Sequence, residues 1–374
     1  MILGGVKVNR EESIKDFKEH FVKGLMEEYK TEFQENLDNN QEKLRGLLIE
    51  GMIDINDKAK KYQGKNENYK LAVLQFELLR INILNESYKI LIHGYSSLWY
   101  LDKNSIYKEI DLKFLFEPFI KFKGKLIQAK NIYMGKVNFY DIQEIIFELV
   151  VECYNSMSEL ARIWLWNLDE EVWVKNGSFS DMYTVKWSEY QGQSETIFAM
   201  DNREKIMKDL LELKKVSEEK LPLVYSVWSN SNLENGDLTK QNMLFINFKA
   251  SKLNNIDFSE SNITTAQFKD TNIKKCEFKR SKLIGTSFEY AKIEGCNFEN
   301  ADLRAVDFRK SILKDITFKN VDLRGSDFTG AIFNNVSFED ASVEEVVFSE
   351  QDVPFLYLTP EQLQTIYITG GIEE

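Results

Sequence analysis

The chain has 374 residues, more than one hydrophobic core usually accommodates, so we expect at least two domains. Its 48 basic and 60 acidic residues give a formal net charge of −12, which disfavours direct binding to nucleic acid or to anionic membranes. No apolar run reaches the roughly 20 residues that span a bilayer, no secretory signal is evident, and three cysteines make no disulfide framework. These properties predict a cytoplasmic protein.

Residues 1–225 predict an α-helical domain whose family the sequence does not reveal. Asn9 and Glu12 form the pattern of a capping box. Large apolar residues follow at helical spacing: Phe17, Phe21, Leu25, Tyr29 and Phe33.

Three further helices are predicted in this domain. The nearly continuous apolar stretch 69–92 predicts a central buried helix, and 138–168 predicts a long amphipathic one. Asp201 with Glu204 predicts the start of another, which ends before Pro222.

The segment 169–198 mixes aromatic and polar residues without a clear period. One interpretation is an excursion that binds a partner or a ligand. The other, which we favour, is a partly buried connector with a small hairpin.

Catalytic patterns are nearly absent, so we expect no enzyme activity, no metal and no cofactor. The two histidines, His20 and His93, lie outside any metal-binding motif, and each is expected to be a solvated or core residue. The acidic cluster 169–171 is expected to be a solvated helix end. An enzyme in the helical domain, with the C-terminal half as an adaptor, stays open as an alternative.

In the second half, large apolar residues recur at every fifth position, a period that neither a helix nor a strand explains. The series runs through 21 centres from Phe248 to Phe348 without an insertion. A second series, two residues ahead of the first, holds small or apolar residues such as Ser251, Ala291 and Ile316. Two of every five side chains therefore point inward, as in a coil with short flat sides and frequent corners.

The segments "ADLRA", "VDFRK", "VDLRG", "SDFTG" and "CNFEN" resemble the pentapeptide-repeat family over about residues 246–349. The resemblance implies a right-handed quadrilateral β-helix with four pentapeptides in each coil. The predicted fold is therefore α + β: the α-helical domain 1–225, the β-helix 226–353 and a short C-terminal capping helix within 354–374. Cys276 and Cys296, one coil apart, are expected to be packing residues and not a disulfide or a metal site.

After the ladder ends, Thr359 and Gln362 form a capping box around Pro360, and Gly370 is the predicted helix end. The cap holds more apolar surface than one coil end needs, and the resemblance implies pairing of C-terminal ends about a two-fold axis. We therefore expect a homodimer. The predicted interface residues are Phe355, Leu356, Leu358, Leu363, Ile366 and Tyr367.

The leading functional hypothesis is a non-catalytic protein-interaction scaffold, with the β-helix as a rigid rod and the helical domain as the partner-binding head. The alternative comes from the resemblance: some family members imitate the width and charge of DNA, bind topoisomerases such as gyrase and protect them from poisons. Residues 241–350 carry a net charge of only −2, but 321–350 carry −6. An acidic docking surface is therefore predicted near the C-terminus, at Glu339, Asp340, Glu344 and Glu345.

Overall fold

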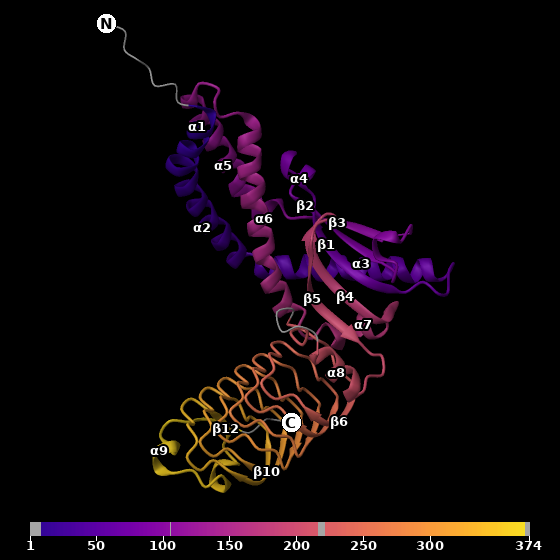
Figure 1. Cartoon of the computed structure of the whole chain (residues 1–374), viewed down its shortest axis with the longest axis vertical. Coiled ribbons are helices and arrows are strands. Elements are labelled where there is room, and N and C mark those ends of the chain that lie inside the picture. The colour runs from indigo at the N-terminus through magenta and orange to yellow at the C-terminus, as the bar shows by residue number, and fades with distance from the viewer. Residues whose placement is uncertain (1–8, 105, 216–220, 371–374) are drawn as a thin grey trace. The chain divides into compact units, whose positions relative to one another are not determined.

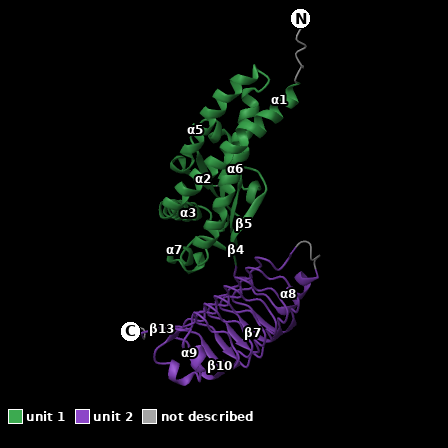
Figure 2. Ribbon diagram, turned by 90° about the vertical axis from the view of Figure 1, so that its left-hand side faces the viewer, with its two compact units in different colours: residues 1–200 green, residues 201–374 purple. Residues whose placement is uncertain are grey.

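The computed structural model describes residues 9–104, 106–215 and 221–370. The chain forms two compact units, 1–200 and 201–374, shown in different colours in Figure 2. The boundary between the units lies earlier than the limit at 225 that the sequence suggests. Each unit has its own hydrophobic core.

Unit 1 combines helices with a β-sheet, whose strands β4 and β5 follow the last helices of the unit (Figure 1). The capping box of Asn9 and Glu12 is confirmed at the start of the first helix. The long amphipathic helix is also confirmed, as α6. The α-helices are α1 Arg10–Phe17, α2 Lys23–Asn39, α3 Gln41–Gln63, α4 Arg80–Leu84, α5 Lys113–Lys130, α6 Phe139–Trp164 and α7 Val172–Lys175. Short π- or 3-10-helical segments are η1 Lys18–Val22, η2 Trp99–Leu101, η3 Asn131–Tyr133 and η4 Leu168–Glu170.

The sheet of unit 1 has five strands in the order β3-β2-β1-β4-β5. Strand β1 pairs antiparallel with β2 and parallel with β4, and β2 pairs antiparallel with β3. The strands are β1 Leu71–Leu78, β2 Lys89–Tyr95, β3 Ile106–Asp111, β4 Phe179–Glu189 and β5 Ser194–Asp201.

The prediction of a buried helix over 69–92 is wrong, and the first domain is not purely α-helical. That stretch forms β1, the short helix α4 and β2. Every residue of β1 except Ala72 is buried, so the strand shows no alternation of polar and apolar residues. A buried strand without alternation cannot be distinguished from a buried helix by periodicity.

The favoured interpretation of 169–198 as a connector with a hairpin is confirmed in part. Strands β4 and β5 follow one another across a short turn, but β4 also pairs with β1 in the middle of the sheet. The other helix prediction here needs correction at its start. Asp201 ends β5, and the helix, α8, spans Met207–Lys214 with Asp209 in its first turn.

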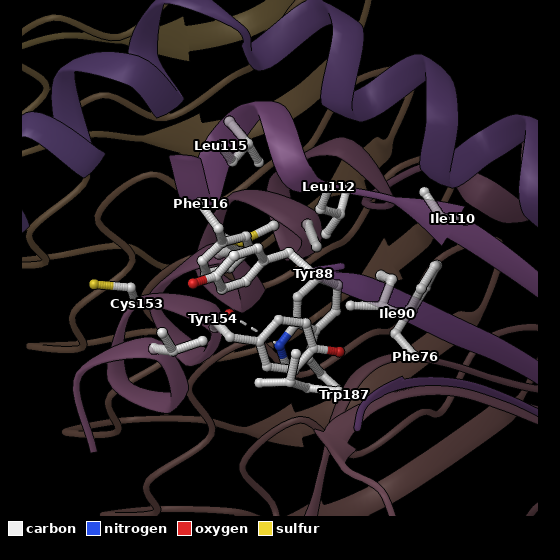
Figure 3. Packing of buried hydrophobic residues seen from close by; sticks show 14 of the residues in the cluster. Phe76, Tyr88, Ile90, Ile110, Leu112, Leu115, Phe116, Cys153, Tyr154 and Trp187 are labelled. Atoms are coloured by element: carbon white, nitrogen blue, oxygen red, sulfur yellow. Dashed lines mark hydrogen bonds between the residues drawn. The ribbon is translucent and has the colours of Figure 1, made fainter. Parts of the chain in front are cut away.

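The core of unit 1 lies between the sheet and the helices α3 and α6, and Figure 3 shows part of it. Trp187 of β4 stacks on Tyr154 of α6 with the ring centroids 4.5 Å apart. Gly51 of α3 lies so close to Ile92 and Ile110 that a Cβ atom would overlap their side chains. Close approach at this glycine brings α3 against β2 and β3.

Unit 2 is a parallel β-solenoid of about 7 turns, as the five-residue period predicts. All 21 predicted centres from Phe248 to Phe348 are buried except Phe333, which is partly buried. Phenylalanines 20 residues apart stack along the axis, for example Phe278 on Phe298 with centroids 4.9 Å apart. The strands are β6 Asn232–Asp237, β7 Lys252–Asp257, β8 Asn272–Lys274, β9 Lys292–Glu294, β10 Ile312–Thr317 and β11 Ile332–Ser337, in one parallel sheet, with β12 Val347–Ser349 in the last coil.

The inward series begins earlier than predicted. Leu223, Trp228, Leu233, Leu238 and Met243 continue the five-residue step backwards from Phe248, and all five are buried. Helix α8 packs on this first coil through Met207 and Leu210. It therefore covers the N-terminal end of the solenoid.

The corners of the coils explain why the fold repeats every five residues. The second residue after every inward centre from Phe248 to Val343 has a positive φ angle, as at Asn300 (57°) and Lys310 (57°). Glycine takes this position at Gly285, Gly325 and Gly330, where the left-handed conformation costs least. Each corner therefore turns the chain onto the next flat side.

At the C-terminal end, the capping box of Thr359 and Gln362 is confirmed, but the predicted helix as far as Gly370 is wrong. After η6 Val353–Phe355, helix α9 covers only Pro360–Leu363, and β13 Tyr367–Thr369 pairs in parallel with β12. Tyr367 N donates to the Val346 carbonyl at 2.8 Å. Pairing with the exposed edge of the last coil satisfies backbone groups that a longer helix would leave open.

Candidate interaction sites

The predicted dimer-interface residues divide into an exposed and an inward-facing group. Phe355, Leu363 and Tyr367 are exposed. Leu356 is buried in the core of its own unit, so it is not available to a partner, whereas Leu358 and Ile366 are partly buried against the same core. The chain turns back on the last coil here, which draws these three side chains inward.

The exposed group is larger than the sequence predicts. Ile368 lies opposite Phe348 in the β12–β13 pair, so it continues an inward column of the solenoid. Among the residues that the structure describes, no further coil follows Ile368, and its side chain is 53% exposed. Tyr357, at 92%, is also exposed. The cap therefore leaves an apolar end surface, defined here as Phe355, Tyr357, Leu363, Tyr367 and Ile368.

The four residues of the predicted acidic surface are all exposed, on the last coil before the cap. In the described part of the chain, Glu339, Asp340 and Glu345 form no ion pair with a basic residue. Glu344 lies near Arg324, whose pKa is raised mainly by its hydrogen bond to Asp322 and further by Glu344. The carboxylates of this surface are therefore largely unneutralised.

Elsewhere on the solenoid, charged residues pair between neighbouring coils. Glu294 lies between Lys274 and Lys314, at 2.9 and 2.5 Å. These two lysines lower the pKa of Glu294 to about 2, mainly through hydrogen bonds. Arg280 likewise bonds Glu260 of the preceding coil at 2.8 Å. Such pairs neutralise part of the charge on the earlier coils.

A further candidate site lies on unit 1, where the sequence offers no motif. Along β1 and β4, alternate side chains enter the core beside α3 and α6, and the others form the second face of the sheet. This face carries the polar residues Gln75, Glu77, His93, Lys186 and Ser188, which we call the polar face. Buried polar groups require hydrogen-bond partners, so each of these residues must be accounted for.

Gln75 is fully buried and satisfies its amide completely. It donates to the Tyr100 hydroxyl at 2.7 Å and to Ser188 Oγ at 2.8 Å, and its carbonyl oxygen accepts from Trp99 Nε1 at 2.8 Å. These bonds fasten the segment 96–102, which we call the strap, over the polar face. Trp99 has φ 49°, a strained left-handed conformation for a bulky residue.

Glu77 is fully buried and only half satisfied. Its Oε2 accepts a hydrogen bond from Nδ1 of His93, whereas its Oε1 is buried and has no hydrogen-bond partner. His93 is therefore a core residue, one of the two types that the sequence predicts, and it is paired with a buried acid that the sequence does not reveal. Leaving a buried carboxylate oxygen without a donor is costly.

Tyrosine rings surround this pair. The His93 ring lies 5.3 Å from Tyr95, 5.8 Å from Tyr107 and 6.3 Å from Tyr190, measured between centroids. Burial, together with the charge of Glu77, raises the pKa of Tyr95 and of Tyr100. Both phenols therefore stay neutral at ordinary pH.

The cysteines and the acidic cluster give no sign of metal binding. Cys276 and Cys296 are buried and free, in one inward column. Across the described ranges, no group of three or more His, Cys, Asp or Glu side chains is arranged to hold a metal ion. In the same ranges, no helix has both the length and the apolar character of a membrane span.

Family comparisons agree with the five-residue ladder. Residues 291–364 match the family model described as a pentapeptide repeat region, and residues 242–280 and 264–300 match the model of pentapeptide repeats (8 copies). The C-terminal part of the chain is a pentapeptide-repeat domain. No family model matches the N-terminal region, and a comparison with curated proteins gives no match for the chain.

Several solved structures resemble the pentapeptide-repeat domain. QnrB1, a plasmid-mediated fluoroquinolone resistance protein, is 15% identical over 39% of this chain and 86% of its own, with a TM-score of 0.27. Rfr23 from the cyanobacterium Cyanothece 51142 is 19% identical over 34% and 98%, with a TM-score of 0.21. HetL, involved in heterocyst differentiation regulation in the cyanobacterium Nostoc sp. strain PCC 7120, is 13% identical over 45% and 92%, with a TM-score of 0.20.

Proposed function

We propose that the protein is a non-catalytic interaction scaffold whose pentapeptide-repeat domain docks a protein partner at its C-terminal end. The observation that carries this proposal is the contrast along the solenoid. On the earlier coils several acidic residues pair with Lys or Arg of a neighbouring coil, whereas the last coils place unpaired Glu339, Asp340 and Glu345 near the apolar end surface. Apolar residues bordered by unpaired charge are typical of a protein interface.

The inward residues of the repeat support a non-catalytic role for this domain. They are consumed in packing, and the outward positions hold mainly short polar and paired charged groups. Unit 1 is then the partner-binding head, and its polar face under the strap is the surface on which it would act.

The experiment that tests docking compares two charge-reversal variants of the full chain. In the first, Glu339, Glu344 and Glu345 become Lys. In the second, the exposed helix residues Glu11, Glu35 and Glu42 become Lys, which changes the net charge equally. A partner captured from host extract by the unaltered chain should be lost with the first variant and kept with the second. Equal capture by both variants would refute docking at the acidic surface.

A second candidate function is binding to a type II topoisomerase such as gyrase by imitation of DNA. The unneutralised acids of the last coils favour it, and the charge ladders of the earlier coils restrict the imitation to that end. Recovery of topoisomerase subunits in the capture experiment, with loss on charge reversal, would select this candidate. Recovery of an unrelated partner would exclude it.

We also propose that two copies associate through the apolar end surface. Ile368 occupies an inward column, and no described coil covers it. Strand β13 is the last described strand of the solenoid. An identical end of a second copy could cover both Ile368 and the outer edge of β13. Light scattering should give twice the chain mass for the intact protein. Replacing Leu363 and Tyr367 with Glu should give the monomer mass. A monomer mass for the intact protein at about micromolar concentration, where stable dimers persist, would overturn the proposal.

A further inference from the structure

We propose that the polar face of unit 1 binds an arginine side chain of a protein partner, with Glu77 as the anion that receives it. This inference rests on the proposed role of unit 1 as a partner-binding head, and it names the chemistry that the head recognises.

One carboxylate oxygen of Glu77 is unsatisfied. Glu77 lies on β1, the central strand of the five-stranded sheet, and is fully buried. One oxygen is occupied by His93, and the other, Oε1, has no donor within the described structure. A buried carboxylate needs more than one hydrogen bond to offset its loss of hydration, so this oxygen is a vacant acceptor.

Aromatic rings surround the Glu77–His93 pair. Tyr95, Tyr100, Tyr107 and Tyr190 present ring surfaces near the Glu77–His93 pair. The faces of such rings attract cations, and a planar guanidinium also stacks on them. An arginine is therefore a better match than a compact ammonium group, because it can stack and donate to Oε1 together.

Lys186 does not neutralise Glu77. Lys186 lies on the same face, but its Nζ donates to Thr196 Oγ1 at 3.1 Å and lies 5.0 Å from the centre of the Trp99 ring. Burial lowers the pKa of Lys186, so this lysine is itself poorly solvated. It does not supply the hydrogen bond that Glu77 lacks.

Exposed apolar side chains indicate that the arginine belongs to a polypeptide. Leu98 and Leu101 of the strap and Tyr107 beside His93 are exposed by 60, 79 and 58%. A free cation would make no use of these side chains, whereas a polypeptide that carries the arginine would cover them. Apolar and aromatic residues around a buried charge are the usual surroundings of an interface hot spot.

Access to Oε1 passes beneath the strap. Tyr100 covers the polar face, and its hydroxyl is held by Gln75 at 2.7 Å. The arginine would enter as Tyr100 moves aside, which breaks one hydrogen bond. The left-handed backbone at Trp99 places strain in the segment that has to move.

The test uses the full chain and two peptide probes, Gly-Arg-Gly amide and its citrulline analogue, which has nearly the same shape but no charge. The chain has only two histidines, so their ring resonances in NMR report separately on the site and on a distant control. With the arginine peptide, the His93 signal should shift and saturate, with a dissociation constant of about 1–10 mM. The exposed His20 should not shift, and the citrulline peptide should leave both signals unchanged.

Two variants keep the test decisive. Glu77→Gln should weaken the binding of the arginine peptide at least about tenfold, roughly the effect of losing one charge-assisted hydrogen bond. Tyr107→Ala changes an exposed side chain, so it should fold normally and weaken binding several-fold. No shift of His93 in the intact protein, or equal shifts with the citrulline peptide, would overturn the inference. Either result would leave docking at the C-terminal coils untouched, because that is measured by a different variant.

Discussion

Replacing Phe298 with Asp is expected to unfold the middle of the pentapeptide-repeat domain. Phe298 is fully buried, stacks on Phe278 at 4.9 Å and on Phe318 at 5.7 Å, and meets Phe288 edge-on at 6.3 Å. An unpaired carboxylate in this column has no donor, so we expect a loss of more than about 4 kcal/mol. Because each coil contacts only its neighbours, damage to one coil interrupts the stacking on both sides.

The matched control is Lys292→Asp, in the adjoining repeat, which changes an outward, exposed side chain to the same acid. Its free energy of unfolding, measured in urea, should stay within about 0.5 kcal/mol of that of the unaltered chain. Fluorescence and circular dichroism across a urea series measure both variants. Equal midpoints for the two would contradict the inward position of the five-residue ladder.

Trp187→Ala should produce the largest loss of stability within unit 1. Trp187 is 1% exposed, stacks on Tyr154, packs on Phe76 at 5.2 Å and donates from Nε1 to the Tyr154 carbonyl at 3.1 Å. Figure 3 shows these rings together in the core. Removing the indole leaves a cavity and removes one hydrogen bond to the Tyr154 carbonyl, so we expect a cost of about 3–5 kcal/mol.

Tyr140→Ala on α6 is the control, because this aromatic side chain is 75% exposed. The two variants should be compared by calorimetry of the full chain, in which each compact unit can give its own transition. Trp187→Ala should lower one transition and leave the other in place. A loss no greater than that of Tyr140→Ala would mean that β4 does not form the centre of the core.

The pentapeptide-repeat domain could be predicted from sequence because its inward positions follow one strict period. The series even extends further than the predicted range. Met243 and Trp228 lie on the same five-residue step, but the prediction counted only from Phe248. Ile368, likewise, lies 20 residues after Phe348. This spacing indicates a strand at β13, and it could have been used to predict that strand instead of the longer helix.

The sheet of unit 1 could not be predicted in the same way, because its central strand β1 is buried on both faces. In β1 the alternation that marks a strand is hidden, since Gln75 and Glu77 are as buried as Leu74 and Phe76. Two charged or amide groups within an apolar run were the available signal, because polar residues in a core need partners on neighbouring strands. Their partners, His93 and Ser188, are distant in sequence and come together only in the folded sheet.

The candidate sites divide along the same line. The exposure of the four acidic residues could be predicted, because outward positions in a regular repeat are known from the register. The interface prediction was less accurate at Leu356, since the turn after Pro354 is irregular and directs that side chain inward. The Glu77–His93 pair depends on strand pairing, which no single-sequence pattern supplies.

The central claim, docking at the C-terminal end of the pentapeptide-repeat domain, is tested most directly by hydrogen exchange of the full chain with and without its captured partner. The account predicts slower exchange of backbone amides in residues 337–350, which hold the acidic surface, with little change in the coils between 240 and 320. Protection confined to those earlier coils, with none at the C-terminal end, would contradict it.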